Sequence, residues 1–134
     1  MSAKVVARLL NGTVIKGTSL DVNPDRPFCH IRGADDVNHL VALADLKALF
    51  FVKDFTGNAA HRDSNAIDPS DARMRGAKKI QIRFADGETL AGITHHFPPS
   101  RPFFFVVPAD ADTNNIRILV NRGAVAEFRA LEAA

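Results

Sequence analysis

The N-terminal part of this sequence recurs in its C-terminal part. Positions 8–35 and 83–110 align without a gap and share 9 identities in 28 positions, where unrelated sequences would share about two. The shared residues include turn glycines and loop prolines: Gly12 and Gly87, Gly17 and Gly92, Pro24 and Pro99, Pro27 and Pro102. The others are Arg8 and Arg83, Arg26 and Arg101, Phe28 and Phe103, Ala34 and Ala109, Asp35 and Asp110. We infer an internal duplication. A copy of about 50 residues has a marginal core alone, so we expect the two copies to pack together.

Both copies carry the pattern of short strands joined by tight turns. Apolar and polar residues alternate through residues 80–84, and an Asp-Gly pair at 86–87 then supplies the chemistry of a two-residue hairpin turn. An Asn-Gly pair occupies the same place at 11–12. A glycine within the returning strand, Gly17 or Gly92, is typical of a bulge or a sharp bend, as at the corner of a small barrel.

A polar segment separates the two copies. Residues 53–77 have little hydrophobic periodicity and are rich in Gly, Asn, Asp, Ser and Pro, which predicts a linker. We therefore divide the chain into a first repeat at 1–52, a polar linker at 53–77 and a second repeat at 78–134. The predicted fold class is mainly β: two small β-barrels in tandem, packed together and joined by the linker.

Charge, cysteine content and hydrophobicity indicate which partners and which cellular compartment fit this protein. The 17 basic and 15 acidic side chains give a net charge of +2, which is too balanced to indicate nucleic-acid binding by itself. A single cysteine, Cys29, excludes an intramolecular disulfide and fits a reducing compartment. No signal-peptide pattern is visible, and no apolar run approaches the roughly 18 residues needed to cross a bilayer. We expect a cytoplasmic protein with no membrane partner.

The order and spacing of the turn residues resemble the Sm/LSm family of small barrels. In the second copy, an apolar strand, the Asp-Gly turn, the run 90–92 (LAG) and Phe97 resemble the family's first motif, and residues 118–125 (ILVNRGAV) resemble its second. The first copy resembles the first motif through residues 6–22, while Asp45-Leu46 stands where Arg-Gly is expected. The tandem arrangement also resembles an uncharacterised bacterial family.

This resemblance implies two Sm-like or SH3-like barrels. It also brings a homo-oligomer into consideration, because Sm barrels commonly form rings by adding strands at their edges. RNA-binding Sm proteins carry an Asp and an Asn that hold a base in the loop after the aromatic, but Pro98 and Pro102 stand there in this chain. Proline offers no side-chain hydrogen bond to a base. Of the family's nucleotide site only Arg122-Gly123 remains, so the resemblance supports the barrel and argues against the usual RNA pocket.

Two equivalent arginines are candidate ligand-binding residues. Arg26 and Arg101 lie in matching proline loops beside Phe28 and Phe103, and together they could clamp a phosphate or a carboxylate. The alternative, which we favour, is that each arginine bonds loop carbonyls or stacks on its aromatic neighbour.

Histidine and cysteine give weaker candidates. His95 and His96, with His30, could suggest a metal site, but adjacent strand residues point to opposite faces and cannot chelate one ion. We expect no metal and keep His96 as a candidate ligand-binding residue. Cys29 and His30 face apart for the same reason, so a buried, unreactive thiol is favoured over a Cys–His nucleophile.

The sequence thus predicts a binding protein and not an enzyme. No Ser/His/Asp order, Gly-rich phosphate loop or paired carboxylates stand out, so we expect no catalytic residue and no cofactor. Residues 103–105 (FFF) present apolar side chains on two faces, and we favour their burial between the repeats over an exposed contact surface. The predicted function is a non-catalytic binding or adaptor module for a protein partner in the bacterial cytoplasm. The alternative is RNA or nucleotide binding through Arg122, Arg26, Arg101 and the basic residues of the linker.

Overall fold

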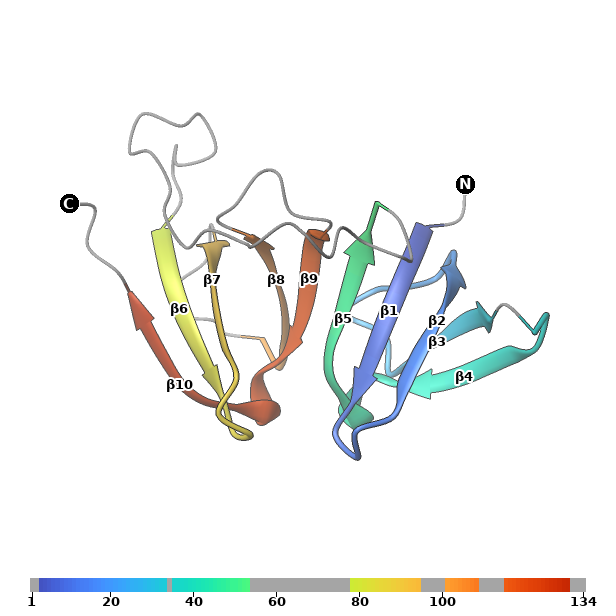
Figure 1. Cartoon of the computed structure of the whole chain (residues 1–134), viewed down its shortest axis with the longest axis horizontal. Helices are drawn as coiled ribbons and strands as arrows, with labels where there is room; N and C mark the ends of the chain where they lie inside the picture. Colours follow the sequence, from blue (N-terminus) through green and yellow to red (C-terminus); the bar gives the residue numbers. More distant parts are fainter. Residues whose placement is uncertain (1–2, 34, 54–77, 95–100, 109–114, 131–134) are drawn as a thin grey trace, which may run out of the picture.

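The computed structural model describes residues 3–33, 35–53, 78–94, 101–108 and 115–130 (Figure 1). These residues form ten strands and two short 3-10 turns, with no α-helix among them. The strands are β1 (Ala3–Leu9), β2 (Val14–Ser19), β3 (Phe28–Gly33), β4 (Asn38–Ala42), β5 (Leu46–Val52), β6 (Lys78–Phe84), β7 (Thr89–Thr94), β8 (Phe103–Pro108), β9 (Asn115–Asn121) and β10 (Val125–Ala130); the turns are η1 (Leu43–Asp45) and η3 (Arg122–Ala124). The mainly β prediction is therefore confirmed. The predicted linker, apart from Lys53, lies outside the described residues.

All ten strands belong to one antiparallel sheet, in the order β10-β6-β7-β8-β9-β5-β1-β2-β3-β4. The sheet is open, with β4 at one edge and β10 at the other, where we had predicted two small barrels. The continuity comes from the pairing of β5 with β9, in which Ala48, Leu49 and Phe50 lie opposite Val120, Leu119 and Ile118. Figure 1 shows these two strands side by side between two lobes, β1–β5 and β6–β10.

The two lobes have corresponding strands. In the gapless alignment of the two copies, β1, β2 and β3 coincide with β6, β7 and β8. The same alignment would place the start of η1, Leu43, at Ile118, whereas η3 begins later, at Arg122. The second lobe therefore has additional residues before its 3-10 turn. This changes one sequence interpretation: Leu43-Ala44, and not Asp45-Leu46, occupies the position of Arg122-Gly123.

The last strands of the two lobes correspond as well. The pairing of β1 with β5 skips Lys47, and the pairing of β6 with β10 skips Ala126. Each skipped residue is the second of a strand that follows directly on a 3-10 turn. Each lobe thus has a β-bulge at the same place, and a bulge locally bends the strand that carries it.

Each lobe packs around its own apolar core, but each core also contains a residue from the other lobe. Leu119 of β9 belongs to the core of the first lobe, and Ala48 of β5 belongs to the core of the second. Side chains alternate between the two faces along a strand. Accordingly Leu49 and Leu119 face the first core, whereas Ala48 and Val120 face the second. The two cores therefore lie on opposite faces of one sheet.

A glycine at the bend of each lobe allows two strands to approach closely. A Cβ atom on Gly17 would lie 2.2 Å from the Arg32 carbonyl oxygen, and one on Gly92 would lie 2.6 Å from the Val107 carbonyl oxygen. At these bends β2 meets β3, and β7 meets β8, through only two paired positions each. No helix in the described part of the chain is long and apolar enough to cross a membrane.

Replacing Gly17 with alanine should destabilise the protein by about 1–3 kcal/mol, because a Cβ atom there collides with backbone that cannot move aside. Gly12→Ala is the matched control. Gly12 has φ +90° with no heavy atom near its Cβ position, so alanine there should cost only about 1–2 kcal/mol of backbone strain. Urea unfolding of both variants measures the difference. A smaller loss for Gly17→Ala than for Gly12→Ala would contradict the close-approach explanation.

Candidate functional site

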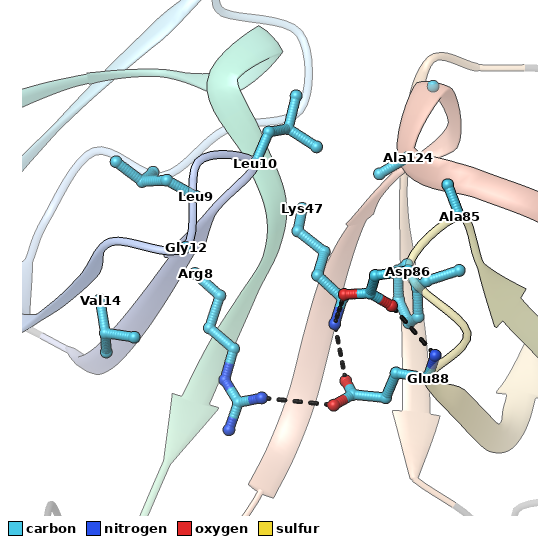
Figure 2. Close-up of a pocket in the computed structure, with 12 residues that line it drawn as sticks. Arg8, Leu9, Leu10, Gly12, Val14, Lys47, Ala85, Asp86, Glu88 and Ala124 are labelled. Carbon is cyan, nitrogen blue, oxygen red and sulfur yellow. Dashed lines mark hydrogen bonds and ion pairs between the residues drawn. The ribbon is translucent and has the colours of Figure 1, made fainter.

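A charged hollow of about 440 Å³ lies between the first hairpin turns of the two lobes. Figure 2 shows Arg8 and Lys47 of the first lobe reaching toward Asp86 and Glu88 of the second. Lys47 Nζ lies 2.7 Å from Asp86 Oδ2 and 3.0 Å from Glu88 Oε1, and Arg8 Nη1 lies 3.5 Å from Glu88 Oε2. Lys47 Nζ also lies 4.8 Å from the centre of the Phe84 ring, a favourable cation–π geometry.

The charged groups of this cluster satisfy one another, and the pKa values of Lys47 and Asp86 shift accordingly. Burial works against the charge of Lys47, but its hydrogen bonds to Asp86 and Glu88 outweigh burial and raise its pKa above the ordinary value. The hydrogen bond from Lys47 lowers the pKa of Asp86. Two cations and two anions balance one another, so the cluster joins the lobes and leaves no net charge to attract a ligand.

Asn121, which the sequence interpretation did not single out, positions the turn that carries Arg122. Its Nδ2 donates to the Leu46 carbonyl oxygen at 2.8 Å and to that of Ala44 at 3.3 Å, while its Oδ1 accepts from the Gly123 amide at 2.9 Å. Asn121 is buried. A single amide side chain thereby ties β9 to the first lobe and caps η3. Only its place before Arg-Gly could have drawn attention to it in the sequence.

Arg122 and Gly123 themselves are exposed on this turn. They line a shallow hollow of about 670 Å³ together with Leu10, Ala44, Pro102, Phe103 and Asn121. The Arg122 amide donates to the Pro102 carbonyl oxygen at 2.8 Å. The Arg122 guanidinium makes no hydrogen bond or ion pair with any residue that the structure describes.

The two loop arginines differ from each other. Arg101 Nη1 lies 3.1 Å from Asp25 Oδ1, which joins the second lobe to the loop that precedes β3. Arg26, the neighbour of Asp25, is exposed. A clamp formed by both arginines would require Arg101 to leave its carboxylate, and their role as ligand-binding residues stays a prediction.

The histidine and cysteine candidates do not form a reactive cluster among the described residues. His30 Nδ1 lies 2.6 Å from Asp21 Oδ2 on the surface. Cys29 points into the core, where burial, followed by the negative charge of Asp21, raises its pKa to about 11. Within the described ranges no three His, Cys, Asp or Glu side chains gather as metal ligands would. His96 lies outside those ranges.

The most distinctive surface is the outer side of β3 and β4, which we call the β4 face and define by Phe28, His30, Leu40 and Ala42. Phe28 pairs with Ala42 and His30 with Leu40, so all four point to the same side. Phe28 is 49% exposed and Leu40 is 63% exposed. The alternate residues of these strands, such as Cys29, are buried in the first core. The free edge of the sheet therefore presents large apolar side chains to solvent.

The corresponding surface of the second lobe is covered. When β3 is aligned with β8 and β4 with β9, the counterparts of Phe28, His30 and Leu40 are Phe103, Phe105 and Leu119. Leu119 is 1% exposed within the core of the first lobe, and both phenylalanines are partly buried against that core. Phe104, on the opposite face, packs against the second core. The favoured interpretation of residues 103–105, burial between the repeats, therefore holds in part: Phe103 and Phe105 pack partly buried against the other lobe, whereas Phe104 packs against its own. The same surface in the first lobe lies open.

The model of a family of unknown function, DUF6982, matches residues 1–132 of the chain. No curated protein and no solved structure matches it significantly.

Removing the Lys47 side chain should weaken the contact between the lobes. We expect Lys47→Ala to lower the free energy of unfolding by about 1–3 kcal/mol, because Asp86 and Glu88 lose their donor and Phe84 loses its packing partner. The exposed Lys16→Ala is the matched control and should change stability by less than about 0.5 kcal/mol. Chemical unfolding followed by circular dichroism measures both, and equal losses would show that the ion pairs do not hold the lobes together.

The same variant should alter the acid sensitivity of the protein. A carboxyl group whose pKa is lowered by folding stabilises the protein above its unfolded pKa, about 3.9 for Asp, and loses that contribution as the pH falls through the folded value. Stability measured from pH 7 to pH 2 should therefore fall more steeply below about pH 4 in the natural protein than in Lys47→Ala. Parallel curves for the two proteins would contradict the assigned cause of the Asp86 shift.

Proposed function

We propose a function for this chain, which belongs to the DUF6982 family of proteins of unknown function: it is a non-catalytic module that binds a protein partner at the free β4 edge. The observation that carries the proposal is Leu40. It is exposed on β4, whereas its counterpart Leu119 on β9 is buried by a neighbouring strand. The first lobe thus leaves its β4 edge exposed, whereas the corresponding edge of the second lobe, β9, is covered by β5.

The backbone of β4 supports binding by strand addition. An edge strand presents a row of unpaired N–H and C=O groups, and natural proteins usually protect such an edge with charged residues or proline. Residues 38–42 (NHLVA) contain no Lys, Arg, Asp, Glu or Pro. A partner strand could therefore add its hydrogen bonds to the edge while its side chains contact Phe28 and Leu40.

The finer description of the fold, two small Sm-like barrels, belongs to the same proposal. It is supported by the matching strand order in the two lobes, by the bulges at Lys47 and Ala126, and by a core for each lobe. In this view the pairing of β5 with β9 is the contact between two barrels. A binding role at the β4 edge extends a type of contact that the chain makes within itself.

RNA or nucleotide binding is the second candidate, and Arg122 is the observation that favours it. Its guanidinium is exposed and without a side-chain partner among the described residues, beside a surface hollow that includes Pro102 and Phe103. Arg26 is exposed in the same way. We rank this candidate below protein binding because Arg101, the third arginine, is already paired with Asp25.

Leu40→Lys should abolish capture of the protein partner, because a charge on the edge strand opposes strand addition. The purified protein is used to recover partners from the source cells after nuclease treatment. Leu20→Lys is the matched control, because Leu20 is 77% exposed but lies outside β4, and it should leave the partner bound. Retention of the same partner by Leu40→Lys would place the binding surface elsewhere.

If nucleic acid is the ligand, Arg122→Ala should weaken binding to a labelled single-stranded RNA and lower the slope of log K against log salt by about 0.7. Arg129→Ala, on the far edge strand, is the control and should leave the slope unchanged. Fluorescence anisotropy over a salt series measures both variants. Weak binding that does not respond to salt or to Arg122→Ala would eliminate this candidate.

A further inference from the structure

We infer that the strand accepted at the β4 edge comes from a different protein and resembles β5, because neither free strand of a second copy matches β5. β10 is charged where β5 is apolar, and β4 paired with itself about Leu40 would place His39 where β5 has Ala48. This inference rests on the proposed function, since it names the partner of the same edge. It follows from a comparison of the two strands that occupy corresponding positions in the two lobes.

The pairing of β5 with β9 shows what an acceptable partner strand looks like. Ala48 and Phe50 of β5 lie opposite Val120 and Ile118, on the face of the second core. Between them, Leu49 lies opposite Leu119 on the face of the first core. The partner strand thus presents apolar side chains on both faces, one set to each core.

The counterpart of β5 in the second lobe is β10, and its pattern differs. When the two strands are aligned on their bulges, Glu127 takes the place of Ala48, and Arg129 takes the place of Phe50. Both charged side chains are exposed and have partners on β6: Glu127 Oε2 lies 3.1 Å from Arg83 Nη2, and Arg129 Nη2 lies 3.2 Å from Gln81 Oε1. The outward side of β10 is therefore polar at the two positions where β5 is apolar.

A second copy docked head to tail would bury these charges. If β10 met β4 in the register of β5 and β9, Glu127 would lie opposite Val41 and Arg129 opposite His39. Val41 is 4% exposed and belongs to the first core, with Cys29 and Ile31 on the paired strand. Moving these two charges out of water and against such residues is unfavourable even with Arg83 and Gln81 in contact with them, because the loss of hydration can exceed the energy of the pair.

The β4 edge therefore selects a partner by side-chain pattern. The strand that fits is antiparallel and uncharged over three positions: small opposite Val41, leucine-like opposite Leu40, and large and apolar opposite His39. The sequence of β5 (LKALFFV) meets this pattern, and β10 (VAEFRA) does not. The same two charges oppose head-to-tail rings of this chain, one form of the homo-oligomer that the Sm resemblance brought into consideration.

The decisive variant is Glu127→Ala combined with Arg129→Phe, which gives β10 the outward side chains of β5. In sedimentation equilibrium the natural protein should have the mass of one chain, 14.6 kDa, and the double variant should have the mass of two or more chains. Adding Leu40→Lys to the double variant should restore the single-chain mass, whereas adding Leu20→Lys should not. Circular dichroism and urea unfolding confirm that each variant is folded.

A peptide probe tests the same pattern without changing β10. A labelled peptide of residues 44–53, extended by lysines for solubility, should bind the natural protein, and the peptide carrying Ala48→Glu and Phe50→Arg should bind at least about tenfold more weakly. Leu40→Lys in the protein should remove binding of the first peptide.

The outcomes separate this inference from the function on which it rests. A folded double variant that stays monomeric, or one whose assembly survives Leu40→Lys, overturns the inference about β10. A natural protein that assembles through Leu40 also overturns it, while leaving β4 as an acceptor edge. If Leu40→Lys disrupts the double variant but leaves the cellular partner bound, the proposed function fails and the inference about the two edges stands.

Discussion

The pairing of β5 with β9 is the contact on which the rest of the structure depends. It joins two five-stranded lobes into one sheet and places the cores on opposite faces. The ion pairs of Lys47 and the hydrogen bonds of Asn121 reinforce the two sides of this seam. Because the seam uses one edge strand from each lobe, it also determines which edges remain free.

Those free edges are chemically unlike each other. On β10, Glu127 and Arg129 protect the backbone in the manner expected of an edge strand. On β4, no charge does so, and Leu40 is left open to solvent. β4 corresponds to β9 and β10 to β5, so a duplication alone would leave two edges that match each other as β9 and β5 do. The charges on β10, and the lack of them on β4, are therefore the feature of the molecule that most directly suggests a binding role for β4. Cys29 is buried, and Lys47 is paired with two carboxylates.

The parts of this fold that are local in sequence could be predicted, and those that depend on distant pairings could not. The positions of the hairpins at 11–12 and 86–87 and the bend glycines follow from residue chemistry, since only glycine permits the approach seen at Gly17 and Gly92. The predicted two-residue turn type is wrong, because it needs a positive φ at both residues of each pair and only Gly12 and Gly87 have one. The open sheet could not be foreseen, because the pattern of apolar and polar residues in β5 and β9 does not indicate which strand each of them will pair with. The same limit applies to the site. Leu40 looks like any apolar strand residue until its counterpart, Leu119, is seen to be covered.

The exchange of residues between the cores has a consequence for how the chain behaves as a whole. Leu119 completes the first core, and Ala48 lines the second, so neither lobe keeps a full set of packing partners when the other is lost. The free energy of unfolding is therefore not the sum of independent contributions from the two lobes. The duplicated chain is therefore a single cooperative unit, in which damage to either half is felt by both.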